Sequence, residues 1–108
     1  MTNAVFYLND GFITRFKISG HTTDFHSEEG RLVCASISSA VYLTANTITD
    51  VIFAKADIAE KDGFMDFALK DKFSECDSVL KGLKLHLTNL SKQYKNFIKI
   101  TTEVQHDA

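Results

Sequence analysis

The sequence of 108 residues has no proline and no tryptophan, and it has only two cysteines and five glycines. Two cysteines, Cys34 and Cys76, are too few for the disulfide framework of a small secreted domain. The N-terminus, MTNAVFYLND, has no apolar signal segment. A run of about 18 apolar residues, which a membrane span requires, is also absent. We therefore expect a chain in the reducing cytoplasm that does not enter a membrane.

The chain also has no large excess of positive or of negative charge. Twelve basic residues are spread along the chain against fourteen acidic ones, which gives a net charge of −2. This balance argues against direct binding to nucleic acid, which depends on neutralising phosphates. Apolar types make up 44% and charged types 24% of the chain, a composition typical of a folded protein. The length suits one domain, so residues 1–108 are expected to share one core.

Motifs for nucleotides and metals are missing too. The sequence contains no GxGxxG, no GxxxxGK[ST], no HExxH and no paired CxxC. His21, His26, Glu28, Glu29 and Cys34 lie in one segment and have the side chains of zinc ligands. Polar loops often contain such residues, however. We therefore expect neither a cofactor nor a metal.

The first twenty residues have the pattern of a β-hairpin. An apolar run at residues 4–8 leads to Asp10-Gly11, a pair suited to the positive φ of a tight turn. Residues 12–18 then alternate with a period of two, which predicts that the even-numbered residues share one face. Residues 21–30 are mostly polar and predict an exposed loop.

Two stretches have helical spacing. From residue 32 to residue 48 apolar side chains recur every three or four positions, and small side chains dominate the beginning of this stretch. Between Cys76 and Tyr94 the apolar spacings are four, three, four, three and four, the strongest helical pattern in the chain. The start of this helix carries Ser74 with Asp77 three residues on, an arrangement that resembles a capping box.

The remaining apolar runs predict strands. Residues 51–58 and 64–69 flank the turn-forming pair Asp62-Gly63, which indicates a second hairpin. Residues 96–104 alternate and predict a last strand, so the order is ββαββαβ. Two helices packed on one face of a largely antiparallel sheet would bury both apolar helix faces. We therefore expect a single α+β domain.

Cys34 is the residue best placed for chemistry. It falls in the first turn of the helix predicted from residue 32, where unpaired N–H groups and the helix dipole stabilise a thiolate. His21 precedes the polar loop, and an imidazole held near Cys34 would complete a Cys/His pair for acyl transfer. These residues alone also allow a small buried Cys34 and a polar loop His21. Cys76 belongs to the apolar face of the second helix and is expected to be an inert core thiol.

The order of these motifs resembles that of a known family. The sequence ISGH at residues 18–21, a short loop, and VCASIS at residues 33–38 resemble the ribosomal-processing cysteine proteases, often called Prp or YsxB-like. That family has Gly-His, a short loop and a Val-Cys-Ala-x-x-Ser helix start. The likeness extends over nearly the whole chain, through the late leucine-rich helix that ends in LSKQY at residues 90–94 and into the final strand.

The resemblance implies a cytoplasmic peptidase that removes the N-terminal extension of a large-subunit ribosomal protein during ribosome assembly. It implies a homodimer, no cofactor, His21 as the general base and Cys34 as the nucleophile. The N–H groups near Cys34 and Ala35, at the predicted helix start, would stabilise the oxyanion. Ser38, one turn beyond Cys34, would hydrogen-bond within the site or to its own i−4 carbonyl. Candidates for supporting roles are therefore Gly20, Asp24, Ala35 and Ser38, with Asp24 as an acid that would orient His21.

The chain departs from the family pattern just before the nucleophile. The family has Gly-x-Asp-Ile-Val-Cys, whereas this chain has EGRLVC at residues 29–34, so Arg31 takes the place of the acid. Loss of the carboxylate would remove a helix cap, while Arg31 would favour a thiolate if it pointed toward Cys34. This departure motivates an alternative function, a non-catalytic, ribosome-associated peptide-binding module of the same fold. A redox or metal-binding protein would need a second reactive cysteine or a bound metal.

Overall fold

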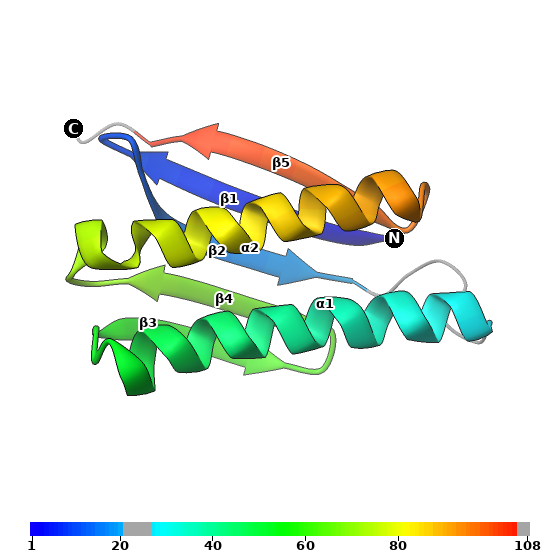
Figure 1. Cartoon of the computed structure of the whole chain (residues 1–108), viewed down its shortest axis with the longest axis horizontal. Helices are drawn as coiled ribbons and strands as arrows, with labels where there is room; N and C mark the ends of the chain where they lie inside the picture. Colours follow the sequence, from blue (N-terminus) through cyan, green and yellow to red (C-terminus); the bar gives the residue numbers. More distant parts are fainter. Residues whose placement is uncertain (21–26, 106–108) are drawn as a thin grey trace.

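The computed structural model describes residues 1–20 and 27–105 (Figure 1). Its strands are β1 (Thr2–Asn9), β2 (Phe12–Ser19), β3 (Ala56–Lys61), β4 (Phe64–Leu69) and β5 (Ile98–Val104). Its helices are α1 (Glu28–Asn46), which continues into the π-helical turn η1 (Thr47–Val51), and α2 (Phe73–Gln93). The strands form one sheet in the order β3-β4-β2-β1-β5, in which only β1 and β5 pair in parallel.

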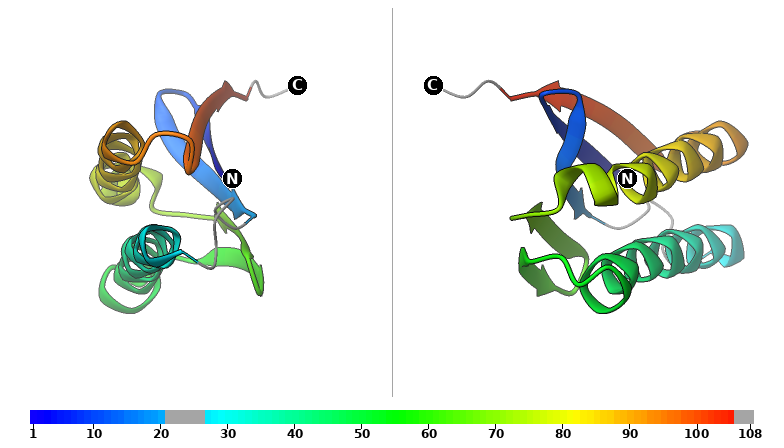
Figure 2. Two further views of the ribbon diagram at one scale, coloured as in Figure 1. Left: turned by 90° about the vertical axis from the view of Figure 1, so that its right-hand side faces the viewer. Right: turned by 60° about the vertical axis from the view of Figure 1, so that its left-hand side comes forward.

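Both helices lie side by side on one face of the sheet, and no element of residues 1–20 and 27–105 covers the other face (Figure 2). The predicted α+β class, the ββαββαβ order and the largely antiparallel sheet are therefore confirmed. The first hairpin is confirmed as well, because Asp10 and Gly11 both have positive φ, at 52° and 82°. Two successive residues of positive φ match the twist of the flanking strands.

Three phenylalanines connect the middle strands under the helices. Phe6 of β1 pairs in register with Phe16 of β2, which pairs with Phe67 of β4. All three side chains are fully buried, and the rings of Phe16 and Phe67 stack at 5.1 Å with an interplanar angle of 7°. A slip of one residue would turn this row toward the uncovered face of the sheet. The row therefore sets the register of both hairpins.

The predicted alternation of β2 fails at its beginning. The register shifts between Tyr7 and Leu8 of β1, and Thr14 is the extra residue on β2. This bulge places Ile13 in the core together with Phe16, although the two differ by an odd number of positions. The strict period of two is therefore wrong for residues 12–14.

The bulge also explains the contacts of the Asp77 side chain. Asp77 does not form the predicted capping box. Its carboxylate accepts the N–H of Ile13 at 3.0 Å and pairs with Lys81 at 2.6 Å. Burial alone would raise the pKa of Asp77, but the hydrogen bonds from Lys81 and Ile13 outweigh it and lower the pKa. Asp77 thus links α2 to β2. It accepts an N–H group of β2 at a position that lies beyond the end of the neighbouring strand β4.

The first helix begins four residues earlier than the sequence pattern predicts. Ser27 is the N-cap, and its hydroxyl accepts the N–H of Gly30 at 2.9 Å. Glu28 and Glu29 lie in the first turn, where acidic side chains complement the helix dipole. A polar loop and the first turn of a capped helix have similar compositions, which is why the boundary was misplaced.

The second hairpin is also shorter than predicted. Residues 51–58 do not form one strand, because η1 extends the first helix to Val51 and β3 begins only at Ala56. The turn itself is as expected, with Gly63 at a φ of 73°.

One segment is long and apolar enough to qualify as a membrane span by length and composition. It is Glu28–Val51, with a mean hydropathy of 1.3 over 18 residues, of which 33% are buried in the fold. Core helices pass the same test, and the inner face of α1 includes Val33, Ile37 and Val41 of the core. Its hydropathy reflects the absence of charge between residues 32 and 49.

The uncovered face of the sheet is polar and charged. Arg15 of β2 forms a double hydrogen bond with the Asp66 carboxylate of β4, at 2.8 and 2.5 Å. Its guanidinium also lies 5.0 Å from the centre of the Tyr7 ring. The hydrogen bonds from Arg15 are the main cause that lowers the pKa of Asp66, and partial burial opposes them.

The pair of Arg15 and Asp66 predicts how the free energy of unfolding changes in acid. Because the pKa of Asp66 is lower in the folded state than in the unfolded chain (about 3.9), its contribution is present above about pH 4 and is lost as the pH falls through the folded value. Asp66→Asn should lower the free energy of unfolding at pH 7 by about 1 kcal/mol and reduce its loss in acid. Urea denaturation at a series of pH values measures both. Asp57→Asn, in a pair exposed at 56% and 74%, is the control. Equal acid dependence in Asp66→Asn and the parent chain would contradict the prediction.

Candidate active site

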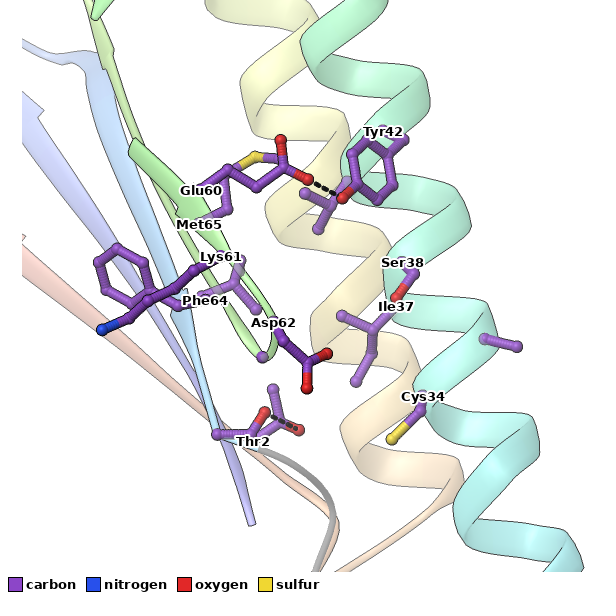
Figure 3. Close-up of a pocket in the computed structure, with 15 residues that line it drawn as sticks. Thr2, Cys34, Ile37, Ser38, Tyr42, Glu60, Lys61, Asp62, Phe64 and Met65 are labelled. Carbon is purple, nitrogen blue, oxygen red and sulfur yellow. Dashed lines mark hydrogen bonds between the residues drawn. The ribbon is translucent and has the colours of Figure 1, made fainter. Parts of the chain in front are cut away.

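A cleft of about 580 Å³ lies between α1 and the β3–β4 hairpin. Figure 3 shows side chains that line it from both sides. The lining residues of α1 are Cys34, Ala35, Ile37, Ser38, Val41 and Tyr42. Those of the hairpin are Glu60, Lys61, Asp62, Gly63, Phe64 and Met65, and Thr2, Ile18 and Gly20 complete the wall. The cleft thus combines segments that are far apart in the sequence.

Cys34 faces this cleft from α1. Its side chain is half-buried and points toward the hairpin in Figure 3. Because α1 begins at Glu28, Cys34 is the seventh residue of the helix and lies beyond the first turn. The prediction that it lies in the first turn is therefore wrong. The effect of the helix dipole falls off within that turn, so it acts on this thiol less than the sequence suggested.

The same shift corrects the prediction for Ala35. Only the first four N–H groups of an α-helix lack partners within the helix. In α1 the N–H of Gly30 already bonds to the Ser27 hydroxyl, and that of Arg31 bonds to the Ser27 carbonyl at 3.0 Å. The N–H groups of Cys34 and Ala35 therefore belong to the regular helix and are not available to an oxyanion. Ala35 remains a residue of the cleft wall.

Ser38 also lines the cleft, one turn beyond Cys34. Because Cys34 and Ser38 both line the cleft, the predicted placement of Ser38 on the same side of the helix as Cys34 is confirmed. The nearby Ser36 makes a helical i−4 bond, in which its hydroxyl donates to the Leu32 carbonyl at 2.9 Å. Its role in chemistry stays a prediction.

Gly20 is fixed at the edge of the cleft by its neighbours. Its N–H donates to the Gly63 carbonyl at 2.9 Å, and its carbonyl accepts the hydroxyl of the buried Thr2 at 3.4 Å. Its φ is 86°, and a Cβ atom there would lie 2.7 Å from the Met1 carbonyl oxygen. Only glycine fits without rearrangement. The residue that precedes His21 is therefore fixed at the cleft.

His21 and Asp24 lie outside the described residues, so their predicted roles stay predictions. The same holds for His26 of the suggested zinc cluster. Within residues 1–20 and 27–105, no group of three or more His, Cys, Asp or Glu side chains is arranged to hold a metal.

The sequence reasoning missed the far wall of the cleft. The Tyr42 hydroxyl of α1 donates a hydrogen bond to the Glu60 carboxylate of β3, which joins the two sides of the cleft (Figure 3). This bond is the main cause that raises the pKa of Tyr42. Asp62 points from the hairpin toward α1 (Figure 3). The only sequence signal here was the Asp62-Gly63 turn, which says nothing about what the turn faces.

The second thiol is unlike the first. Cys76 has no exposed surface and packs in the core beneath α2. Burial is the main cause that raises its pKa, and the charges of Glu75 and Asp71 add to the effect. A buried thiol of raised pKa is a poor nucleophile. The prediction that Cys76 is a core residue is confirmed.

The fold is that of known proteases. It matches the S. aureus ribosomal processing protease Prp in complex with a substrate peptide, with a TM-score of 0.84 and 21% identity over 95% of this chain and 100% of that one. The same protease with a covalently linked product peptide matches with a TM-score of 0.82 and 22% identity over the same shares. SMU.848 from Streptococcus mutans matches with 0.83 and 20% identity over 97% and 96%. No curated protein sequence matches significantly.

The family follows from the sequence itself. Residues 1–99 match the family model of the cysteine protease Prp. The chain therefore belongs to the cysteine protease Prp family, and it is a cysteine protease. The resemblance seen in the short motifs around residues 18–21 and 33–38 is confirmed.

Gly20 provides a stability test of the cleft edge. Gly20→Ala should lower the free energy of unfolding by about 1–3 kcal/mol, because the new Cβ meets the Met1 carbonyl at a positive φ. Gly11→Ala is the matched control, since Gly11 has a φ of 82° but open space around a Cβ. Chemical denaturation compares the two variants. Equal losses would show that the contact with Met1 does not constrain Gly20.

The two thiols should also differ in reactivity. Near neutral pH, iodoacetamide should alkylate Cys34 at least about tenfold faster than Cys76, because Cys76 is fully buried and has a raised pKa. Peptide mapping by mass spectrometry after timed labelling gives both rates in one sample. Labelling in urea, where both thiols are exposed, is the control. Equal slow rates in the folded protein would count against Cys34 as a reactive thiol.

Proposed function

We propose that this protein is an endopeptidase that removes the N-terminal extension of a large-subunit ribosomal protein during ribosome assembly, with Cys34 as the nucleophile and His21 as the general base. The observation that carries the proposal is the half-buried Cys34 thiol in the wall of a cleft in a Prp-family chain. The fixed position of Gly20, directly before His21, supports the pairing of the two residues.

The proposed chemistry has two steps. His21 takes the proton of Cys34, and the thiolate sulfur attacks the carbonyl carbon of the scissile peptide bond. The C–N bond then breaks, the new N-terminus leaves with the proton held by His21, and a thioester remains on Cys34. A water molecule, deprotonated by His21, attacks the thioester and releases the carboxylate and the thiol. No metal or cofactor takes part in these steps.

The lining of the cleft suits a peptide substrate. Its walls combine apolar side chains, such as Ile37 and Phe64, with the polar groups Ser38, Glu60 and Asp62. Apolar walls with a few polar groups are typical of ligand sites. Asp24 stays a proposed orienting partner of His21, and Ser38 a proposed polar contact within the site.

Arg31 does not leave the helix without a cap. Ser27 supplies the cap, so the family acid that Arg31 replaces is not needed for that purpose. This removes one reason to expect an inactive, purely peptide-binding chain. That alternative now rests on the substitution alone, and the cleavage test below separates the two functions.

The assembly and the location of the protein belong to the same proposal. The resemblance to the family implies a homodimer, and newly made ribosomal proteins would be met in the cytoplasm. Both cysteines are thiols in the structure, which agrees with a reducing compartment. The proposed partner is thus the N-terminal segment of a ribosomal protein.

The decisive test uses a synthetic peptide that spans the N-terminal segment of this organism's own ribosomal protein. Mass spectrometry should show one defined cut, and Cys34→Ala should lower its rate at least about 1000-fold. His21→Ala should give a comparable loss. Cys76→Ala, which removes the other thiol, should retain most of the activity.

A binding measurement distinguishes the alternative function, a peptide-binding module, from the case in which this peptide is not the partner. Cys34→Ala should still bind the peptide, because the rest of the cleft is intact. If the parent chain binds the peptide without cutting it, the protein is a binding module and the proposed activity is wrong. If it neither binds nor cuts, this segment is not its partner.

A further inference from the structure

The cleft between α1 and the β3–β4 hairpin ends at a pair of polar residues far from the thiol. The lining residues of α1 extend from Cys34 to Tyr42, and those of β3 are Glu60 and Lys61. In the part of the chain that the structure describes, no residue after Tyr42 in α1 or before Glu60 in β3 lines the cleft. The cleft therefore ends where Tyr42 and Glu60 face each other, at the opposite end from Cys34 (Figure 3).

A hydrogen bond crosses the cleft at this end. The Tyr42 hydroxyl of α1 donates to the Glu60 carboxylate of β3. Tyr42 is 45% exposed and Glu60 is also exposed, so neither side chain is needed to fill the core. The bond raises the pKa of Tyr42, so the hydroxyl keeps its proton and stays a donor at neutral pH. We call this pair the Tyr42–Glu60 bridge, because it joins the two walls of the cleft at the surface.

The helix gives the distance from the thiol to the bridge. Cys34, Ser38 and Tyr42 follow one another at intervals of four residues, so they lie on one side of α1. An α-helix rises about 1.5 Å per residue, and Tyr42 is therefore about 12 Å along the axis from Cys34. A peptide in extended conformation covers about 3.3–3.6 Å per residue. About three substrate residues thus fit between the thiol and the bridge.

The register of the β3–β4 hairpin holds Glu60 in this position. Glu60 pairs with Met65 of β4, which is buried in the core. Register partners point to the same face of a sheet, so the strand pairing directs Glu60 toward α1. Ile58 is the preceding residue of β3 on this face, and it is 45% exposed on the far side of the bridge. The bridge thus separates the cleft from a second apolar position.

We propose that the Tyr42–Glu60 bridge is the end wall of the substrate cleft, and that it limits the peptide to about three bound residues on one side of the scissile bond. This inference rests on the proposed function, because the occupant is the proposed peptide substrate and Cys34 is the proposed nucleophile. A fourth residue on that side has to turn out of the cleft into water. Tyr42 and Glu60 therefore determine specificity for length, and neither takes part in the bond-breaking steps.

Two sets of peptides test the wall. One set is shortened residue by residue on the N-terminal side of the cut, and the other set on the C-terminal side. In one of the two sets, kcat/KM of the parent chain should rise about tenfold for each residue up to the third, because its side chain is buried between α1 and the hairpin. The fourth residue should change kcat/KM less than about twofold, since it lies in water.

Substitutions separate the wall from the charge of the pair. Tyr42→Ala removes the wall, so a fourth residue with an apolar side chain should reach Ile58 and raise kcat/KM about fivefold or more. Glu60→Gln keeps an acceptor for the Tyr42 hydroxyl and should retain the limit of three residues. Tyr7→Ala, the same change on the uncovered face of the sheet, is the matched control and should keep the parent profile. Tyr42 and Glu60 are exposed, so their variants should fold.

The outcomes distinguish this inference from the proposed function. If the peptide is cut but neither set levels off at the third residue, or if Tyr42→Ala keeps the parent profile, the wall is wrong and the proposed function stands. If the parent chain binds the peptides without cutting them, the same sets are compared by Kd from fluorescence anisotropy. The same limit is then expected in Kd, and only the proposed activity is wrong. If no peptide of either set is bound or cut, both are wrong.

Discussion

The row of Phe6, Phe16 and Phe67 is the constraint on which the other features depend. These side chains are register partners on adjacent strands, and all three are fully buried. Because a slip of one residue would expose the row, both hairpins are fixed relative to each other. That register places the end of β2 beside the turn between β3 and β4, where Gly20 bonds to Gly63. The edge of the cleft is therefore a consequence of core packing.

The candidate site shows how a cleft is built on a small fold. Helix α1 contributes the thiol of Cys34, and the hairpin contributes the opposite wall with Glu60 and Asp62. The bond between Tyr42 and Glu60 joins the two walls. Cys34, Tyr42 and Glu60 lie on a helix and a strand, which hold a site more firmly than loops do. The departure at Arg31 affects the beginning of the helix, where Ser27 already caps it.

The two outer surfaces of the protein have opposite character. The uncovered sheet face carries the pair of Arg15 and Asp66, together with a cation above the Tyr7 ring. The outer side of α1 exposes Leu32 and Leu43, and residues 32–49 contain no Asp, Glu, Lys or Arg. Water solvates the first surface readily, whereas the second gains free energy when it is covered.

The sequence alone determined the element order, both hairpin turns and the core position of Cys76, because these features follow from local periodicity and turn chemistry. It also determined the family, through short motifs that match along most of the chain. The beginning of α1 at the local cap of Ser27 was missed because a polar loop and a capped first turn look alike in sequence. The bulge at Thr14 and the bond from Ile13 to Asp77 were decided only by tertiary structure. A bulge and a long-range bond depend on which partners the fold brings near, and a one-dimensional pattern does not contain that information.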